Sequence, residues 1–187
     1  GDKENGAFFS HMNVMLANAL YKRGFIKEGK EVMDSIYEMA TVERAGIAPV
    51  LPEYINSQGK GLYLYLTGSA SWYIYTLFEE ILGIKFELGE ILLEPKLLAS
   101  DFTSSCIETE FFLLKKRIKL IYKIKTNVPQ NKPLVIKEAC LSGQTPLMTK
   151  ELRKGSLRSL TGFTAGTCRI KPTLLKSAHN LIILTLG

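Results

Sequence analysis

The pattern of apolar and polar positions along the chain changes near residue 88. Before that point apolar residues recur at helical spacing, and after it β-branched and alternating patterns dominate. The pattern predicts helices over residues 9–23, 27–40 and 68–82. It predicts strands over residues 90–93, 106–114, 117–125, 134–139 and 181–186. We therefore expect an α+β protein with a helical part, 1–88, and a β part, 89–187.

The three expected helices differ in how their apolar residues are distributed. In the first, Met12, Leu16 and Leu20 recur every four residues, and Gly24 follows where a left-handed residue ends a helix at little cost. The second has one apolar stripe with charged residues off it, as in an outer helix. The third is apolar almost all round until Glu79, which predicts burial against neighbours on most sides. An outer amphipathic helix beside a buried helix is typical of a two-layer helical barrel.

The expected strand 117–125 alternates apolar and mainly basic positions with one exception, which predicts a half-buried antiparallel strand. A basic cluster falls at an expected hairpin turn and consists of Lys115, Lys116, Arg117 and Lys119. Residues 142–178 follow no clear pattern.

Composition narrows the class of protein. Hydrophobic residues make up 46% and charged residues 22%, as in globular proteins, and no apolar run approaches the ~18 residues of a spanning helix. The net charge of +6 is scattered without a nucleic-acid-binding signature, so we expect no nucleic-acid partner. Cys106, Cys140 and Cys168 lack metal-ligand spacing, so we expect neither a disulfide framework nor a metal site, and a reducing, cytoplasmic location.

Two motifs could bind an anion. In Lys3-Glu4-Asn5-Gly6-Ala7-Phe8-Phe9-Ser10-His11-Met12-Asn13, the histidine falls in the first turn of a helix, where the helix dipole favours an anion. In the segment 59–72, GKGLYLYLTGSASW, Thr67 is a natural N-cap and Gly68 permits close approach to the backbone. Spacing alone also allows purely structural roles. The histidine could be hydrogen-bonded to a neighbouring carbonyl, and Thr67 and Gly68 could simply cap the helix. Lys60 between two glycines does not match P-loop spacing and is interpreted as a surface loop.

These motifs, with GEILLEPKL at 89–97, resemble in order the C-terminal part of the glycoside hydrolase family 94 phosphorylases, of the cellobiose and chitobiose phosphorylase type. The resemblance covers about the first half of the chain and implies the last helices of an (α/α)6 barrel followed by an antiparallel, jelly-roll-like β-sandwich. It implies phosphorolysis, with inversion, of a β-linked glucose or N-acetylglucosamine disaccharide. Inorganic phosphate is then a co-substrate, and no cofactor is expected.

The resemblance also implies the roles of individual residues. His11, the Thr67 hydroxyl and the Gly68 N–H would hold the phosphate, while Lys3, with Glu4 beside it, would line the acceptor-sugar site. The family's general acid, an aspartate, is expected upstream of Gly1, since Asp2 does not match its motif. We expect no catalytic residue within the chain and no activity from it alone. Glu4, Glu53 and Glu94 were considered as substitute acids, and structural or solvated roles are favoured for them.

A start at Gly1 rather than methionine is interpreted as a segment of a longer protein. Expected partners are the disaccharide, phosphate and the remainder of the parent chain, with a homodimer favoured. Two alternatives remain open. The parent could be a cyclic β-1,2-glucan synthase, which would make the protein membrane-associated, or the chain could be a truncated, non-catalytic remnant kept for carbohydrate binding or assembly.

Overall fold

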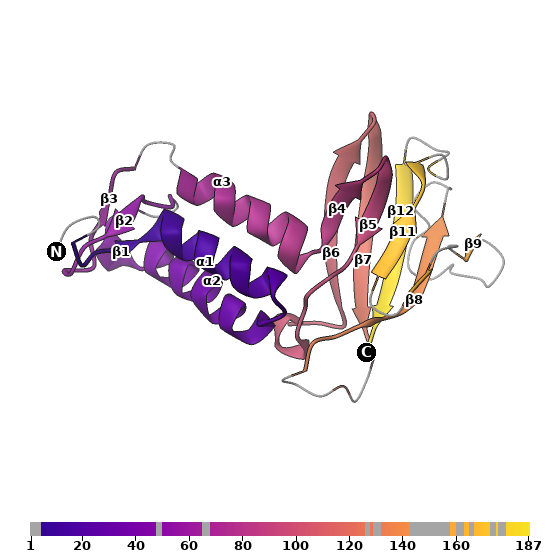
Figure 1. Ribbon diagram of the computed structural model, residues 1–187, viewed down its shortest axis with the longest axis horizontal. Coiled ribbons are helices and arrows are strands. Elements are labelled where there is room, and N and C mark those ends of the chain that lie inside the picture. Colours follow the sequence, from indigo (N-terminus) through magenta and orange to yellow (C-terminus); the bar gives the residue numbers. More distant parts are fainter. Residues whose placement is uncertain are drawn as a thin grey trace. The chain divides into compact units, whose positions relative to one another are not determined.

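The computed structural model of this chain has a mixed α+β fold (Figure 1). It describes residues 5–47, 50–64, 68–125, 128, 132–142, 158–159, 163–164, 167–172, 175 and 179–187. The chain divides into two compact units, Gly1–Ile81 and Leu82–Gly187. Helices dominate the first unit, and strands dominate the second.

Three helices lie where the hydrophobic pattern predicts them. They are α1 (Ser10–Lys22), α2 (Ile26–Thr41) and α3 (Gly68–Tyr75), the last continuing as a π-helical stretch over Thr76–Ile81. A 3₁₀ turn, Glu43–Ala45, follows α2. The predicted glycine stop after α1 is confirmed, because Gly24 is left-handed with φ of 84°.

Helices α1 and α2 form an antiparallel hairpin through one buried face of each. On α1 this face carries Val14, Ala17 and Tyr21. The Tyr21 ring lies against Gly29 of α2, where an added Cβ would come within 2.7 Å of the ring. Close packing at this glycine joins the two helices, which confirms the amphipathic character predicted for α2.

Helix α3 lies beside α1 and runs in the same direction, whereas α2 runs in the opposite direction (Figure 1). Contacts along the pair agree with this arrangement, since Gly68 meets His11 at one end and Thr76 meets Asn18 at the other. Near the end of α1, the ammonium group of Lys22 lies 5.7 Å from the centroid of the Tyr75 ring.

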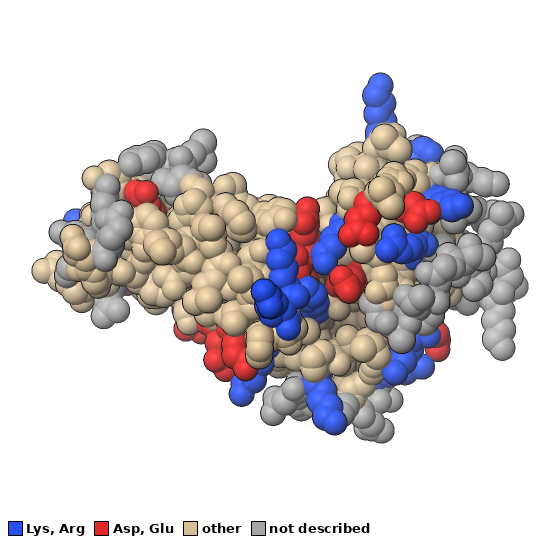
Figure 2. Space-filling model, viewed as in Figure 1, with Lys and Arg blue, Asp and Glu red and all other residues tan. Residues whose placement is uncertain are grey.

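The distribution of buried residues corrects one expectation. On α1 the apolar stripe with Met12 and Leu16 is exposed, by 62% and 51%, and the opposite face is buried. Helix α3 is not buried on most sides, because Ile74 is 60% exposed and α1 is its main neighbouring helix. Figure 2 accordingly shows a broad uncharged area over the helical unit. An apolar face of this extent on two adjacent helices is typical of a surface that another element covers.

A small sheet stands at the start of α1. It consists of β1 (Phe8–Phe9), β2 (Tyr54–Ile55) and β3 (Gly61–Leu62), all antiparallel. Phe9 pairs with Tyr54, and the backbone N–H of Ser10 continues the ladder by donating to the carbonyl of Glu53 at 2.8 Å. The sheet therefore fixes residues 53–62 against the first turn of α1.

The second unit contains two sheets. The first, ordered β10-β11-β5-β4, is antiparallel and comprises β4 (Ile84–Glu87), β5 (Glu90–Leu93), β10 (Phe163–Thr164) and β11 (Thr167–Ile170). The second, ordered β6-β7-β12-β8-β9, comprises β6 (Cys106–Leu113), β7 (Lys116–Ile124), β8 (Ile136–Ser142), β9 (Arg158–Ser159) and β12 (His179–Leu186). Residue 88, the expected limit of the helical part, lies in the turn between β4 and β5.

Strand β7 differs from its prediction in one respect. It pairs antiparallel with β6 but parallel with β12, from Arg117 opposite His179 to Ile124 opposite Leu186. The five-stranded sheet is therefore mixed rather than purely antiparallel. As a central strand, β7 buries Ile121 as well as the alternate positions, which accounts for the exception in its pattern.

The predicted hairpin turn at the basic cluster is confirmed. Leu114 and Lys115 join β6 to β7 with φ of 50° and 62°, as in a two-residue turn with both central residues left-handed. Two cross-strand ion pairs follow the turn, Arg117 with Glu110 and Lys119 with Glu108 at 2.6 Å, and beyond the far end of β7 Lys125 pairs with Glu138 of β8 at 3.2 Å. These partly exposed pairs neutralise part of the basic charge of this segment and contribute little stability each.

Candidate functional site

Two of the five residues predicted for binding are described by the structure, and they lie together. His11 is the second residue of α1, and Gly68 is the first residue of α3. The other three, Lys3, Glu4 and Thr67, lie outside the described residues.

The imidazole of His11 lies directly over the backbone of Gly68. A Cβ built at residue 68 would be 2.3 Å from Cε1 and 2.6 Å from Nε2 of His11, distances that real Cβ atoms do not reach. The contact exists because α1 and α3 run side by side in the same direction and begin at the same level. Only glycine at residue 68 allows the ring this position, so the two motifs meet through a specific steric match.

The start of each helix is suited to an anion. The N-cap of α1 is Phe9, whose side chain makes no capping hydrogen bond, and neither α1 nor α3, both described in full, has an acidic residue in its first turn. Free N–H groups and the helix dipole give each N-terminus positive potential. Because the two N-termini are adjacent, their potentials act on the same region, which is the chemistry of an oxyanion site.

Aromatic side chains flank this helix junction. The Trp72 ring centroid lies 6.3 Å from that of His11, tilted by 47°, and Tyr75 meets Trp72 edge-on at 5.4 Å. Ser71 donates its hydroxyl to the carbonyl of Gly68 at 3.1 Å within the first turn of α3. The Trp72 contact joins α3 to the His11 ring, whereas the Ser71 bond lies within α3.

The structure adds Ser10 and Glu53 to the site. The side-chain atoms Ser10 Oγ, His11 Nε2 and Glu53 Oε2 are buried and have no hydrogen-bond partner among the described residues. From the sequence, Glu53 is interpreted only as a possible substitute acid, and Ser10 has no assigned role. The only sequence signal for Ser10 is its place in the first motif, because its burial depends on pairing with a segment some forty residues away.

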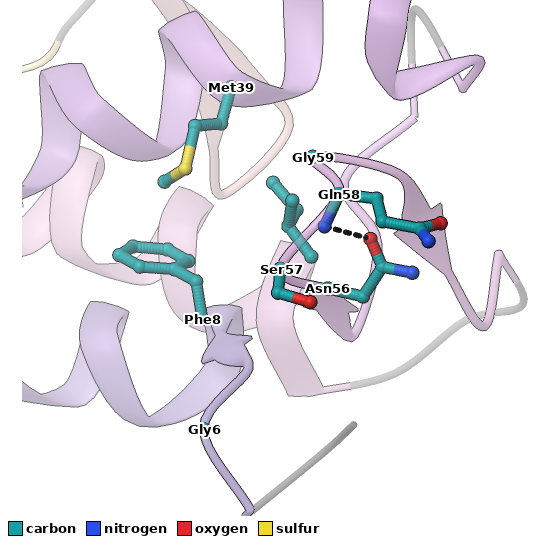
Figure 3. Close-up of a pocket in the computed structure, with 8 residues that line it drawn as sticks. Gly6, Phe8, Met39, Asn56, Ser57, Gln58 and Gly59 are labelled. Atoms are coloured by element: carbon teal, nitrogen blue, oxygen red, sulfur yellow. Dashed lines mark hydrogen bonds between the residues drawn. The ribbon is translucent and has the colours of Figure 1, made fainter. Parts of the chain in front are cut away.

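A separate pocket of about 330 Å³ lies beside the small sheet (Figure 3). The residues that line it are Gly6, Phe8, Met39, Ile55, Asn56, Ser57, Gln58 and Gly59. The side chains of Phe8 and Met39 point toward one another across it. Asn56 Oδ1 accepts hydrogen bonds from the backbone N–H groups of Gln58 and Lys60, both at 3.0 Å. Lys60 thus stands at the end of a tight, side-chain-stabilised turn, with its own side chain exposed.

Glu94, also considered as an acid, lies in the second unit and pairs with Lys85 at 3.0 Å. Within the part of the chain that the structure describes, no cluster of three or more His, Cys, Asp or Glu side chains could hold a metal ion. No described helix combines the length and apolar character needed to cross a membrane.

Comparison with protein-family models gives no match to this chain, and comparison with curated proteins gives none either. The contact between His11 and Gly68 and the buried polar atoms around it therefore carry the functional argument.

Proposed function

We propose that this chain is the C-terminal segment of an inverting glycoside phosphorylase of the family 94 type, with a phosphate half-site where α1 meets α3. The observation that carries the proposal is the position of the His11 ring on the backbone of Gly68. The resemblance assigns both residues to the phosphate, and they come from motifs 57 positions apart (68 minus 11). Thr67 completes the proposed set.

The arrangement of the helices supports the proposed barrel. In a two-layer barrel, parallel inner helices alternate with outer helices that run back. Helices α1 and α3 are parallel neighbours and α2 runs antiparallel on α1, as two inner helices and one outer helix would. The exposed apolar residues of α1 and α3 then lie on the face that further inner helices of the parent chain would cover. We propose the second unit as the family's β-sandwich domain.

The main task of this half-site in the proposed reaction is to position the phosphate. A phosphate oxygen attacks the anomeric carbon, the bond from that carbon to the bridging oxygen breaks, and a carboxylic acid gives its proton to the leaving oxygen. Phosphate is already anionic, so donors that hold it in line supply the main contribution. His11, Thr67 and Gly68 would hold it, and Lys3 and Glu4 would contact the acceptor sugar. The acid is expected upstream, so the chain alone should bind phosphate without turnover.

The proposal is tested by titrating the chain with inorganic phosphate while recording the imidazole and backbone amide resonances, so that binding is also measured in a variant without His11. The chain has two histidines, so His179→Ala, in the second unit, assigns the spectrum and serves as the matched control. We expect saturable shifts of the His11 signals in the wild type and in His179→Ala, and at least tenfold weaker binding in His11→Ala. Equal binding by all three proteins would contradict the proposal. Release of sugar 1-phosphate by the chain alone would show that the proton donor lies within it.

A further inference from the structure

The backbone of Glu53 is held on both sides at the start of α1. Its carbonyl accepts from the N–H of Ser10 at 2.8 Å, and its N–H donates to the carbonyl of Tyr63 at 3.1 Å. Tyr63 itself is left-handed, with φ of 57°, which is uncommon for a bulky residue. Three segments of the chain therefore converge to fix the position of Glu53.

The backbones of Glu53 and Ser10 are joined at the start of α1. The hydrogen bond from the Ser10 N–H to the Glu53 carbonyl extends the antiparallel pairing of β1 and β2, in which Phe9 lies opposite Tyr54. His11 follows Ser10 directly and its ring lies over Gly68. Glu53, Ser10 and His11 are therefore all held at or beside the first turn of α1.

All three side chains hold a buried polar atom that has no partner among the described residues. Ser10 is fully buried, at 0% exposure. Folded proteins leave few such atoms unpaired, and each one is destabilising unless it has a role. Three of them at or bonded to the first turn of α1, whose N-cap side chain makes no hydrogen bond, indicate a site built to be completed by a ligand.

The chemistry of Glu53 distinguishes it from the phosphate donors. A carboxylate only accepts hydrogen bonds and repels an anion, whereas the imidazole N–H and the hydroxyl can donate. A ligand that satisfies the whole cluster must carry an anionic group for His11 and hydroxyl donors for Glu53. A sugar held next to a phosphate has both, and charge-assisted bonds from hydroxyl groups to a carboxylate are strong.

We infer that Glu53 is a sugar-binding residue, which accepts a hydroxyl hydrogen bond from the hexose that lies beside the phosphate. This inference rests on the proposed function, because it takes the anion at His11 to be phosphate. The ligand class is a hexose 1-phosphate, or a hexose and phosphate bound together.

The test compares inorganic phosphate with glucose 1-phosphate and N-acetylglucosamine 1-phosphate as probes on the full chain. The proteins are the wild type, Glu53→Gln, and Glu38→Gln, an exposed site on α2, as the matched control. We expect the wild type and the control to bind at least one sugar phosphate at least tenfold more tightly than phosphate. In Glu53→Gln this advantage should vanish, while the affinity for phosphate changes by less than threefold.

Other outcomes separate the two proposals. No phosphate binding by the wild type overturns the proposed function itself. Equal losses for phosphate and sugar phosphate in Glu53→Gln would make Glu53 a partner of the phosphate, and an unchanged advantage would give it no role in binding; either overturns the inference.

Thermal unfolding distinguishes a structural role. The ligand-free Glu53→Gln protein should melt at the same or a higher temperature than the wild type, because the buried Glu53 Oε2 has no hydrogen-bond partner to lose among the described residues. A large fall, or failure to fold, would show that Glu53 serves packing and would also overturn the inference.

Discussion

The side-chain amide of Asn18 donates a buried hydrogen bond of 3.1 Å to the hydroxyl of Thr76. This bond joins α1 to α3 across 58 positions of sequence, at the residue where α3 changes to π-helical geometry. Both side chains are almost fully buried, with 3% and 0% exposure. The bond thus fixes the register of the two helices and, seven to eight residues earlier, the contact of His11 with Gly68.

Replacing Thr76 with valine tests this role. The substitution keeps the shape of the side chain and leaves the Asn18 amide without this acceptor, so we expect a loss of about 1–3 kcal/mol in the free energy of unfolding. Urea denaturation followed by circular dichroism measures it. The control is Thr41→Val, because the Thr41 hydroxyl is exposed and bonds only within its own helix, and it should cost less than about 0.5 kcal/mol. Equal losses of unfolding free energy in Thr76→Val and Thr41→Val would show that the bond between Asn18 and Thr76 has no special role.

Gly68→Ala should displace the His11 ring. The new Cβ would fall 2.3 Å from Cε1 of the ring, so the ring must rotate away or the helices must separate. We expect at least tenfold weaker phosphate binding and a shift of the His11 imidazole resonances even without ligand. Ser71→Ala, in the same turn of α3, adds no atom near His11 and should leave binding within twofold. Wild-type binding by Gly68→Ala would remove the steric basis of the site.

Two left-handed glycines flank strand β4 and form a matched pair. Gly83 has φ of 66°, and a Cβ there would lie 2.1 Å from backbone atoms of Glu94, whereas Gly89 has φ of 80° with open space around it. Gly89→Ala should cost about 1 kcal/mol from backbone strain alone. Gly83→Ala must also separate two backbones and should cost at least about 2 kcal/mol more, within the range of severe point mutations. Chemical denaturation of both variants checks the difference.

Tyr122 makes stability depend on alkaline pH. Its ring is fully buried on β7 and its hydroxyl donates to the carbonyl of Leu82, and burial raises the pKa of this phenol well above its usual value. Above about pH 10 the unfolded chain releases the phenolic proton while the folded protein keeps it. The folded state therefore loses stability as pH rises beyond that point, by up to about 1.4 kcal/mol per pH unit.

Tyr122→Phe isolates this contribution. At pH 7 the variant should lose about 1–2 kcal/mol, because the Leu82 carbonyl loses its donor. Between pH 9.5 and 11 its stability should fall less steeply than that of the wild type, in urea denaturation at each pH. Tyr37→Phe, at a 61% exposed residue, should match the wild type in both respects. Parallel curves for Tyr122→Phe and the wild type would contradict the assigned cause.

Local signals predicted the three helices and five strands, β5, β6, β7, β8 and β12. The four-residue spacing and Gly24 located α1, and the alternation after Arg117 located β7, because helix and strand periods are properties of the local chain. The β5 range was predicted without error, and β8 began two residues later than expected. The buried face of α1 could not be predicted, since both of its faces carry apolar residues and only the position of α2 selects Val14 and Tyr21.

In the candidate site, too, some residues were predicted from the sequence and others were found only in the structure. The resemblance of the motifs indicated His11 and Gly68, and the structure brings these two together. Ser10 and Glu53 were missed as binding residues, because their backbones come together only after β1 pairs with β2. The parallel pairing of β7 with β12 was also missed, because the alternation of apolar residues within a strand does not identify the strand that pairs with it.

By itself, the sequence determined the three helices, five of the strands, the glycine stop at Gly24 and the hairpin at Leu114 and Lys115, because each depends on residues within a few positions of one another. Tertiary structure alone decided which face of α1 is buried and which polar atoms at its start lack partners among the described residues. It also decided that the His11 ring of the first motif contacts the Gly68 backbone of the second. Those properties depend on the distances between segments some forty to sixty residues apart, which packing sets and local periodicity does not.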